Sequence, residues 1–203
     1  ATSYTSSPNS DYVVDSFTGK QVIDSKADLE VIEAFTSFDV FEVGGGYAAL
    51  ALGVQYRENQ LSQDYDELSN QDSFTFVIGN PDIDGSQDVW AAFGELALPL
   101  TDDLDVQVAL RYEDYGGNIG STVDPKLAVS YRASDTLSFR GSISTSFRAP
   151  TVFLAQGGAT SLQQILDPVQ GAVAFVAVRT SGNEELKPEE STAYNLGISF
   201  EPF

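Results

Sequence analysis

The chain contains no cysteine, no histidine and no methionine among its 203 residues. Without histidine it cannot build a His-ligated haem or zinc site or a His-based catalytic triad. The lack of thiols fits a cell-envelope protein and a cytosolic protein equally well. No basic segment followed by an apolar one stands at the N-terminus, so we expect the chain to begin at an internal or processed point.

Basic residues are scarce, and long apolar runs are missing. Ten Lys and Arg stand against 30 Asp and Glu, which gives a formal charge of −20. Nucleic-acid binding requires a basic surface, so that class of function is excluded. No apolar run approaches the ~18 residues of a membrane helix, which excludes a helical membrane protein. No nucleophile, acid–base pair or metal constellation stands out, so we predict neither an enzyme nor a bound cofactor.

The dominant feature of the sequence is alternation. Over 104–112 every second residue is apolar or aromatic, and the same period continues over 123–132 and 137–147. A period of two predicts β-strands with one apolar and one polar face. An interruption of the pattern near Thr36 and Ser37 predicts a β-bulge. Further strands are expected over 29–43, 48–57, 89–100 and 192–200, with a weaker one near 13–23.

Two environments produce this alternation. A soluble sandwich buries the apolar faces, whereas an outer-membrane barrel turns them to lipid and lines a wet lumen with the polar faces. The lengths of the connections favour the barrel, because short and long ones alternate as in an up-and-down barrel. The short ones are 44–46, 101–103 and 133–135, and the longer ones are 58–88, 114–121 and 149–190. We predict an all-β, antiparallel up-and-down transmembrane barrel segment of about seven or eight strands, with 58–88 and 149–190 as long extracellular loops.

Several short motifs, taken in order, resemble the barrel of TonB-dependent outer-membrane receptors. They are VWAAFGEL at 89–96, LRYEDY at 110–115, VDPKL at 123–127, LSFRGS at 137–142, SFRAP at 146–150 and GNEELKPE at 182–189. The last is similar to the family's Asn–Leu–Lys–Pro–Glu segment, which precedes a strand. The resemblance implies a roughly 22-stranded barrel filled by an N-terminal plug. Such a receptor imports a scarce ligand with energy from an inner-membrane complex.

The resemblance also sets expectations for the role of this chain. No plug-like domain and no energy-coupling box is recognisable in residues 1–203, and Phe203 is out of phase with the last strand, so we expect a fragment of one barrel domain. The implied partners are outer-membrane lipid, the TonB complex acting through a plug, and a siderophore, cobalamin, oligosaccharide or peptide. The implied location is the outer membrane of a Gram-negative cell. Two alternatives stay open: a small complete outer-membrane barrel with a structural or adhesive role, and a soluble acidic β-sandwich that binds a partner.

Basic side chains recur on the predicted inward face. They can line a ligand path, or they can pair with carboxylates on neighbouring strands. The inward residues are Arg57, Arg111, Lys126, Arg132 and Arg140, with Gln55, Glu95, Glu113 and Asn195 beside them. The ligand-binding candidates are Arg111, Arg132, Arg140, Arg148, Arg179 and Asn183.

The acidic segment around Asp82 has a second interpretation. Asp82, Asp84 and Asp88 resemble part of a calcium loop with oxygen ligands, although the closing Glu and the full spacing are missing. The alternative is a solvated external loop, whose carboxylates keep that surface soluble.

Overall fold

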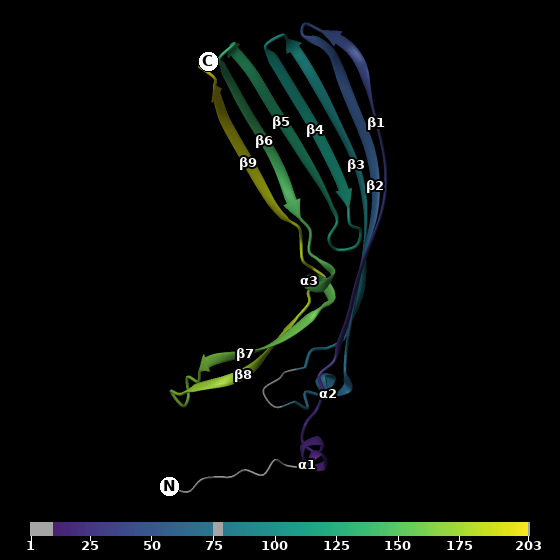
Figure 1. The fold of residues 1–203 in the computed structure, drawn as a ribbon, viewed down its shortest axis with the longest axis vertical. Helices are drawn as coiled ribbons and strands as arrows, with labels where there is room; N and C mark the ends of the chain where they lie inside the picture. The colour runs from purple at the N-terminus through teal and green to yellow at the C-terminus, as the bar shows by residue number, and fades with distance from the viewer. Residues whose placement is uncertain (1–9, 75–78, 203) are drawn as a thin grey trace.

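One antiparallel sheet dominates the computed structural model, which describes residues 10–74 and 79–202. Seven strands pair in the order β1-β2-β3-β4-β5-β6-β9, and β7 and β8 form a separate hairpin between β6 and β9 (Figure 1). The sheet is therefore an up-and-down meander with one insertion. The strands are β1 (Ile23–Val43), β2 (Gly46–Tyr65), β3 (Ile83–Thr101), β4 (Leu104–Asp114), β5 (Ser121–Ser134), β6 (Leu137–Arg148), β7 (Gly158–Leu166), β8 (Val173–Ser181) and β9 (Glu189–Phe200).

The helices are short. They are α1 (Asp11–Asp15), α2 (Glu67–Asn70) and α3 (Val152–Gln156). In the part of the chain that the structure describes, no helix has the length and apolar character needed to cross a membrane. α3 follows β6 and lies where the β7–β8 hairpin leaves the sheet (Figure 1).

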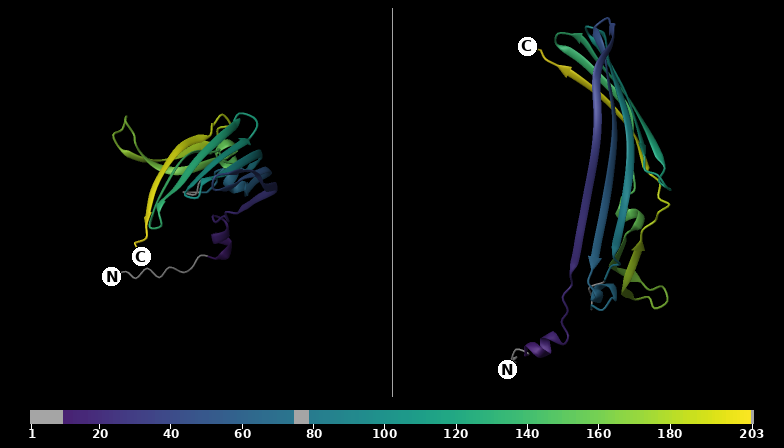
Figure 2. Two further views of the ribbon diagram at one scale, coloured as in Figure 1. Left: turned by 90° about the horizontal axis from the view of Figure 1, so that it is seen from above. Right: turned by 90° about the vertical axis from the view of Figure 1, so that its right-hand side faces the viewer.

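The sheet is a single curved layer with a stepped edge. Seen from above, its strands follow an arc (Figure 2, left). β1, β2 and β3 have 21, 20 and 19 residues, whereas β4, β5 and β6 have 11, 14 and 12. The three long strands extend past the others toward the long connections (Figure 1). The short turns all lie at the opposite end of the sheet.

Strand register aligns the apolar residues into continuous rows on one face. One row crosses all seven strands through Phe38, Leu50, Leu96, Val108, Leu127, Ile143 and Tyr194. No second layer covers this face in the described residues, and Leu110 and Leu196 are 51% and 94% exposed. A sandwich would hide such residues in its core. The soluble-sandwich alternative is therefore wrong for the described sheet, whose apolar face requires a hydrocarbon environment.

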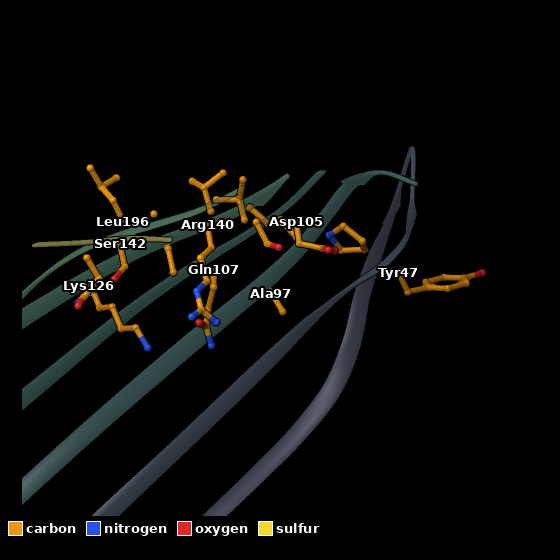
Figure 3. A pocket seen from close by; sticks show the side chains of 16 residues that line it. Tyr47, Ala97, Asp105, Gln107, Lys126, Arg140, Ser142 and Leu196 are labelled. Carbon is orange, nitrogen blue, oxygen red and sulfur yellow. Dashed lines mark hydrogen bonds between the residues drawn. The ribbon is translucent and has the colours of Figure 1, made fainter. Parts of the chain in front are cut away.

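The polar residues occupy the opposite face, as predicted. One of their rows runs through Ala97, Gln107, Ala128, Ser142 and Asn195. Figure 3 shows the side chains of Gln107, Lys126 and Arg140 on one side of the sheet and that of Leu196 on the other. Over the span shared by all seven strands, the sheet thus separates an apolar outer surface from a polar inner one.

The described sheet is open at both edges. β1 pairs only with β2, and β9 pairs only with β6 in this sheet. A small complete barrel would join its first and last strands by hydrogen bonds, so that alternative is not supported. The outer edges of β1 and β9 carry unpaired backbone groups, which need further strands in hydrocarbon.

The predicted loop over 58–88 is wrong at both of its ends. β2 continues to Tyr65 and β3 begins at Ile83, so the connection contains only 66–82. Their pairing extends from Arg57 opposite Val89 to Gln63 opposite Ile83. Polar residues occupy both faces of this extension, so the period-two signal fades while the backbone ladder continues.

Three smaller expectations also need correction. The segment predicted as a loop over 149–190 contains α3 and the β7–β8 hairpin, and β9 begins at Glu189. The weak strand near 13–23 is wrong, because α1 lies there and β1 begins at Ile23. The bulge in β1 falls between Asp39 and Phe41, just beyond its predicted position.

Candidate functional site

Glu113 on β4 is the centre of a charged cluster on the polar face. It is only 4% exposed. Arg57 of β2 donates to both carboxylate oxygens, from Nη1 at 3.2 Å and from Nη2 at 2.6 Å. Arg111 Nε and the Tyr115 hydroxyl each donate at 2.5 Å. Paired, charge-assisted hydrogen bonds of this kind are among the stronger polar contacts in proteins, so the cluster holds its members in fixed positions.

The cluster reaches across β3 to β1. Gln55 Oε1 accepts hydrogen bonds from Arg57 Nη1 at 3.0 Å and from Arg111 Nη2 at 3.1 Å. The Gln55 amide in turn donates to Glu33 of β1 at 2.5 Å. On β3 the residue between them is Ala91, which stands opposite Gln55. Its small side chain leaves room for the long side chains of β2 and β4 to meet.

An aromatic ring supports the cluster from beneath. The ring of Phe93 lies across Gly53, where an added Cβ would stand 2.1 Å from the Phe93 Cζ atom. The guanidinium carbon of Arg111 lies 5.4 Å from the centroid of the same ring. A cation over a ring face is attracted by the ring quadrupole. Position 53 therefore requires glycine, because the Phe93 ring occupies the space that a side chain at this position would fill.

The long connections are tied to one another at the end of the sheet away from the short turns. Arg179 of β8 forms an ion pair with Asp72 at 3.1 Å. The backbone N–H of Thr160 donates to the Asn80 side chain at 2.6 Å. Lys187 donates to the backbone carbonyl of Asn118. The described parts of these connections, 66–74, 79–82, 115–120 and 149–188, therefore form one loop ensemble.

A hollow of about 750 Å³ occupies the polar face near the short turns. Lys126 of β5 and Arg140 of β6 line it together with Asp105 and Gln107 of β4 (Figure 3). The stem of Arg140 crosses Gly197 of β9, where a Cβ would stand 2.5 Å from Nε. This half of the polar face is open, in contrast to the packed cluster around Glu113.

The structure does not gather the predicted site residues into one site. Arg111 belongs to the Glu113 cluster, and Arg140 lines the hollow. Arg132 lies beside the short turn before β4, with its Nε 3.8 Å from an Asp103 carboxylate oxygen.

The other three candidates belong to the loop ensemble and its root. Arg148, at the end of β6, pairs with Glu189 across the strands at 2.9 Å. Arg179 is on the β7–β8 hairpin. Asn183 follows that hairpin, and its Oδ1 accepts from the Glu185 N–H at 2.9 Å.

Two of the three carboxylates suggested for calcium have other partners. Asp82 accepts from the Tyr65 N–H at 2.8 Å, and Asp88 accepts from the Tyr56 hydroxyl at 2.9 Å. Over 10–74 and 79–202 no group of three or more Asp and Glu side chains is arranged to hold a metal ion. The structure therefore does not bring Asp82, Asp84 and Asp88 together as calcium ligands.

Sequence reasoning placed Glu113 on the inward face but did not identify it as the centre of a cluster. Its partner Arg57 is 56 positions away along the chain, and only strand register brings them together. The spacing of Arg111 and Glu113, two positions apart on one face, was the available signal. Gly53 and Gly197 carried no signal, because their role depends on the neighbouring strand.

These features together define a class of protein. A one-layer curved antiparallel sheet with apolar rows outside, charged rows inside and its long connections at one end is the wall of an outer-membrane type β-barrel. Open edges and rows that cross every strand fit a segment of a larger barrel wall.

Comparison with known proteins agrees with this class. The family model "TonB dependent receptor-like, beta-barrel" matches residues 1–202. A probable TonB-dependent siderophore receptor, PirA of Acinetobacter baumannii, is 26% identical over 160 residues, which are 75% of this chain and 20% of that protein. The chain belongs to the TonB-dependent receptor β-barrel family.

Solved structures share the fold. The siderophore receptor PirA from Pseudomonas aeruginosa superposes with a TM-score of 0.66 at 18% identity, over 88% of this chain and 30% of that one. A ferric enterobactin receptor mutant (PfeA) from the same species, in complex with enterobactin, gives 0.67 at 18% identity, over 87% of this chain and 25% of that one. The chain thus spans between a fifth and a third of the length of these proteins.

Proposed function

We propose that this chain forms part of the barrel wall of a TonB-dependent outer-membrane receptor that takes up a ferric siderophore. The observation that carries the proposal is the inversion of the sheet, with uncovered apolar rows on one face and charged rows on the other. Family membership supports the receptor class. The remaining strands and the plug would come from outside residues 1–203.

Each part of the described structure has a role in this proposal. The outward rows contact lipid, and the inward rows line the path of the ligand. The loop ensemble faces the outside of the cell, where 66–82 and 149–188 help to capture the ligand. Arg148, Arg179 and Asn183 are the candidates for that capture, and Arg111, Arg132 and Arg140 belong to the wall. Energy comes from the TonB complex through the plug.

A siderophore is the ligand class that best fits the related proteins. The curated relative and the structural neighbours are siderophore or ferric enterobactin receptors by name. The basic side chains on the inner face of an otherwise acidic chain suit an iron complex with negatively charged oxygens. Cobalamin, an oligosaccharide or a peptide has no such support.

Uptake by cells tests the proposal. The complete receptor containing this chain is expressed in a host that lacks its own siderophore receptors, with and without a functional TonB complex. Cells are given radiolabelled iron as ferric enterobactin, or labelled cyanocobalamin, or a labelled maltooligosaccharide. We expect TonB-dependent accumulation of iron alone. Uptake of cyanocobalamin or sugar instead of iron, or iron uptake that is independent of TonB, would contradict the proposal.

A further inference from the structure

The part of β3 nearest the loop ensemble has an edge that no strand covers. The pairing of β3 with β4 ends at Trp90 opposite Asp114, whereas its pairing with β2 continues to Ile83. Residues 83–89 therefore pair on one side only, where β3 runs on past the end of β4 (Figure 1). Over 10–74 and 79–202, no hydrogen bond joins the backbone of this edge to any segment other than β2. A bare strand edge of this kind offers N–H and C=O groups to another extended chain.

A groove of about 610 Å³ lies beside this free edge. Residues 86–88 of β3 line one side of it, Val152 and Ala155 of α3 line another, and the turn 114–119 lines its end. The groove therefore occupies the place that β4 leaves empty, and its volume is within the usual range of ligand-binding pockets.

Packing and a hydrogen bond hold α3 on the inner face of β3. A Cβ at Gly85 would stand 2.7 Å from Val152 Cγ1, so the helix lies directly against the β3 backbone. Val152 is 7% exposed. The Gln87 amide donates to the Pro150 carbonyl just before the helix at 3.2 Å. The wall of the groove formed by α3 is therefore fixed in place relative to the free edge.

The groove and the surface around it are acidic. Asp88, Asp114 and Glu184 line the groove, and none of the lining residues is Lys or Arg. Lys187 contacts the groove's end, where it donates to the Asn118 carbonyl. On the outer face of β1, β2 and β3 beyond the Tyr56–Trp90 pair, strand register places one basic residue among many acidic ones. The basic residue is Lys26, and the acidic ones are Asp24, Asp28, Glu30, Glu58, Asp64, Asp84 and Asp88.

The strand pattern indicates the kind of chain that fits. In a strand added to this edge, every second side chain would stand beside Asp84 and Asp88, and the others would face Val152 and Ala155 of α3. Opposite charges across neighbouring strands attract, so the first set should be basic and the second small and apolar. The ring of Trp90 is 63% exposed at the same edge and can receive a cation over its face. A second copy of this chain, with its formal charge of −20, is a poor match for an acidic groove.

We propose that the free edge of β3 and the groove beside it bind an extended peptide segment of a partner protein, with basic side chains at every second position and small apolar ones between them. The segment adds a strand to β3 where β4 has ended, so backbone hydrogen bonds hold it and the carboxylates select it. The groove lies on the loop side of the Tyr56–Trp90 pair, whose ring centroids are 4.7 Å apart. The partner therefore approaches from outside the cell. Only this side of approach rests on the proposed receptor function.

Peptide binding to the complete receptor, purified in a nonionic detergent, tests the proposal by fluorescence anisotropy. The probe is a dye-labelled peptide with blocked ends and the sequence Lys-Val-Lys-Val-Lys-Val-Lys, which is as long as the free edge. It should bind, and added salt should weaken the binding. A peptide of the same composition with its Lys and Val in separate blocks should bind roughly tenfold more weakly, and one with Glu in place of Lys should not bind measurably. N-methylation of every second residue should abolish binding in one of its two phases only, because only one row of peptide N–H groups faces β3.

Variants of the receptor locate the site. Asp84→Asn and Asp88→Asn each remove one charge beside the added strand and should weaken binding roughly threefold to fivefold. Glu30→Gln is the matched control, because Glu30 is in the same cross-strand row as Asp88 but two strands away from the groove. Its affinity should stay within about twofold of the unmodified receptor. Thermal unfolding of each variant checks that the fold is kept.

Hydrogen exchange shows whether the edge itself is used. Amides of 83–89 that do not pair with β2 should exchange rapidly in the receptor alone and slow down when the alternating peptide is added. Rapid exchange that the peptide leaves unchanged, equal binding of the block peptide, or equal loss in both N-methyl phases would overturn the proposal. Amides that are already protected in the receptor alone would overturn it too, since a segment outside residues 1–203 or a second copy then occupies the edge. None of these measurements uses iron uptake, so a failure of the siderophore proposal and a failure of this one are distinguishable.

Discussion

The polar face carries two groups of basic side chains in opposite surroundings. Arg57 and Arg111 surround a buried carboxylate near the loop ensemble, whereas Lys126 and Arg140 stand without an ion pair in an open hollow near the short turns. A paired cation on a barrel wall is a structural element, because its hydrogen bonds are already used. A cation without an ion pair keeps its hydrogen-bond donors free. Basic residues at alternating positions can thus be braced by a carboxylate in one half of a wall and left without an ion pair in the other.

The largest effect should follow from removing the shared carboxylate. Glu113→Gln leaves two arginines without their charge partner in a site that is 4% exposed at its centre. Breaking a buried ion pair from one side costs about 3 kcal/mol. Urea unfolding of the complete receptor in detergent measures this loss. Glu95→Gln, an exposed carboxylate on the same face, should cost less than about 1 kcal/mol. Equal stability losses in the two variants would contradict a special structural role for the Glu113 cluster.

A smaller loss is expected from a methyl group at Gly53. Gly53→Ala places a Cβ where Phe93 Cζ lies 2.1 Å away, so the ring must move and Arg111 loses its support. Overpacking of this kind costs about 2 kcal/mol. Gly94→Ala is the matched control, since the nearest atom to its Cβ is the end of a flexible leucine, Leu52 Cδ2, at 3.1 Å. The same unfolding measurement applies, and a control that is destabilised as much as Gly53→Ala would count against the role of Phe93.

Loss of one hydroxyl should have a still smaller effect. Tyr115→Phe removes the group that donates to Glu113 at 2.5 Å and accepts from Arg57 Nη2 at 2.8 Å. The ring stays against Phe147, whose centroid is 5.7 Å away. We expect a loss of about 1 kcal/mol in the free energy of unfolding. In a double-mutant cycle with Glu113→Gln the two effects should be non-additive, because both variants break one network. Additive effects would mean that Tyr115 acts independently of the cluster.

The weakest effect concerns the loop ensemble and its pH dependence. The Asp66 carboxylate accepts a hydrogen bond from the Val22 N–H at 2.8 Å. It also caps α2 by accepting from the Ser69 N–H. These hydrogen bonds, that of Val22 above all, lower the pKa of the Asp66 carboxyl below its ordinary value. A lowered pKa in the folded state means that the contact stabilises the loop above the ordinary pKa of Asp. This contribution is lost as the pH falls through the lowered value.

Hydrogen exchange measures that loss locally. After correction for intrinsic rates, the amides of Val22 and Ser69 should lose protection between pH 7 and about pH 3. The variant Asp66→Asn should show low protection at both pH values. Protection that does not change with pH in the unmodified protein would contradict the assignment.

The fold could be predicted from sequence wherever the environment differs between the two faces of a strand. Val108 is on the apolar face and Gln107 is on the polar face, so the sequence alternates there. Past Arg57 on β2 both faces are polar, so nothing in the pattern distinguishes strand from loop, and the prediction over 58–88 failed there. The same loss of contrast hid the β7–β8 hairpin.

The site was less predictable, because it depends on register. The family resemblance and the inward arginines were recognisable, but whether an arginine pairs depends on which carboxylate faces it across one or two strands. Arg111 and Arg140 look alike in sequence. The roles of Ala91 and Gly197 depend on the assembled sheet. Ala91 leaves room between the long side chains of β2 and β4, and Gly197 leaves room for the Arg140 side chain.

Spin-label accessibility along single strands tests the central claim most directly. The described wall has no cysteine. Single cysteines are introduced at Gln107 and Val108 of β4, and at Ala128 and Val129 of β5, in the complete receptor reconstituted in lipid, after every native cysteine outside residues 1–203 has been replaced by serine. The account predicts that labels at 108 and 129 collide mainly with oxygen dissolved in the bilayer, and that those at 107 and 128 collide mainly with a water-soluble nickel complex. The reverse pattern, or equal access at all four positions, would contradict a wall with lipid outside and a polar bore inside.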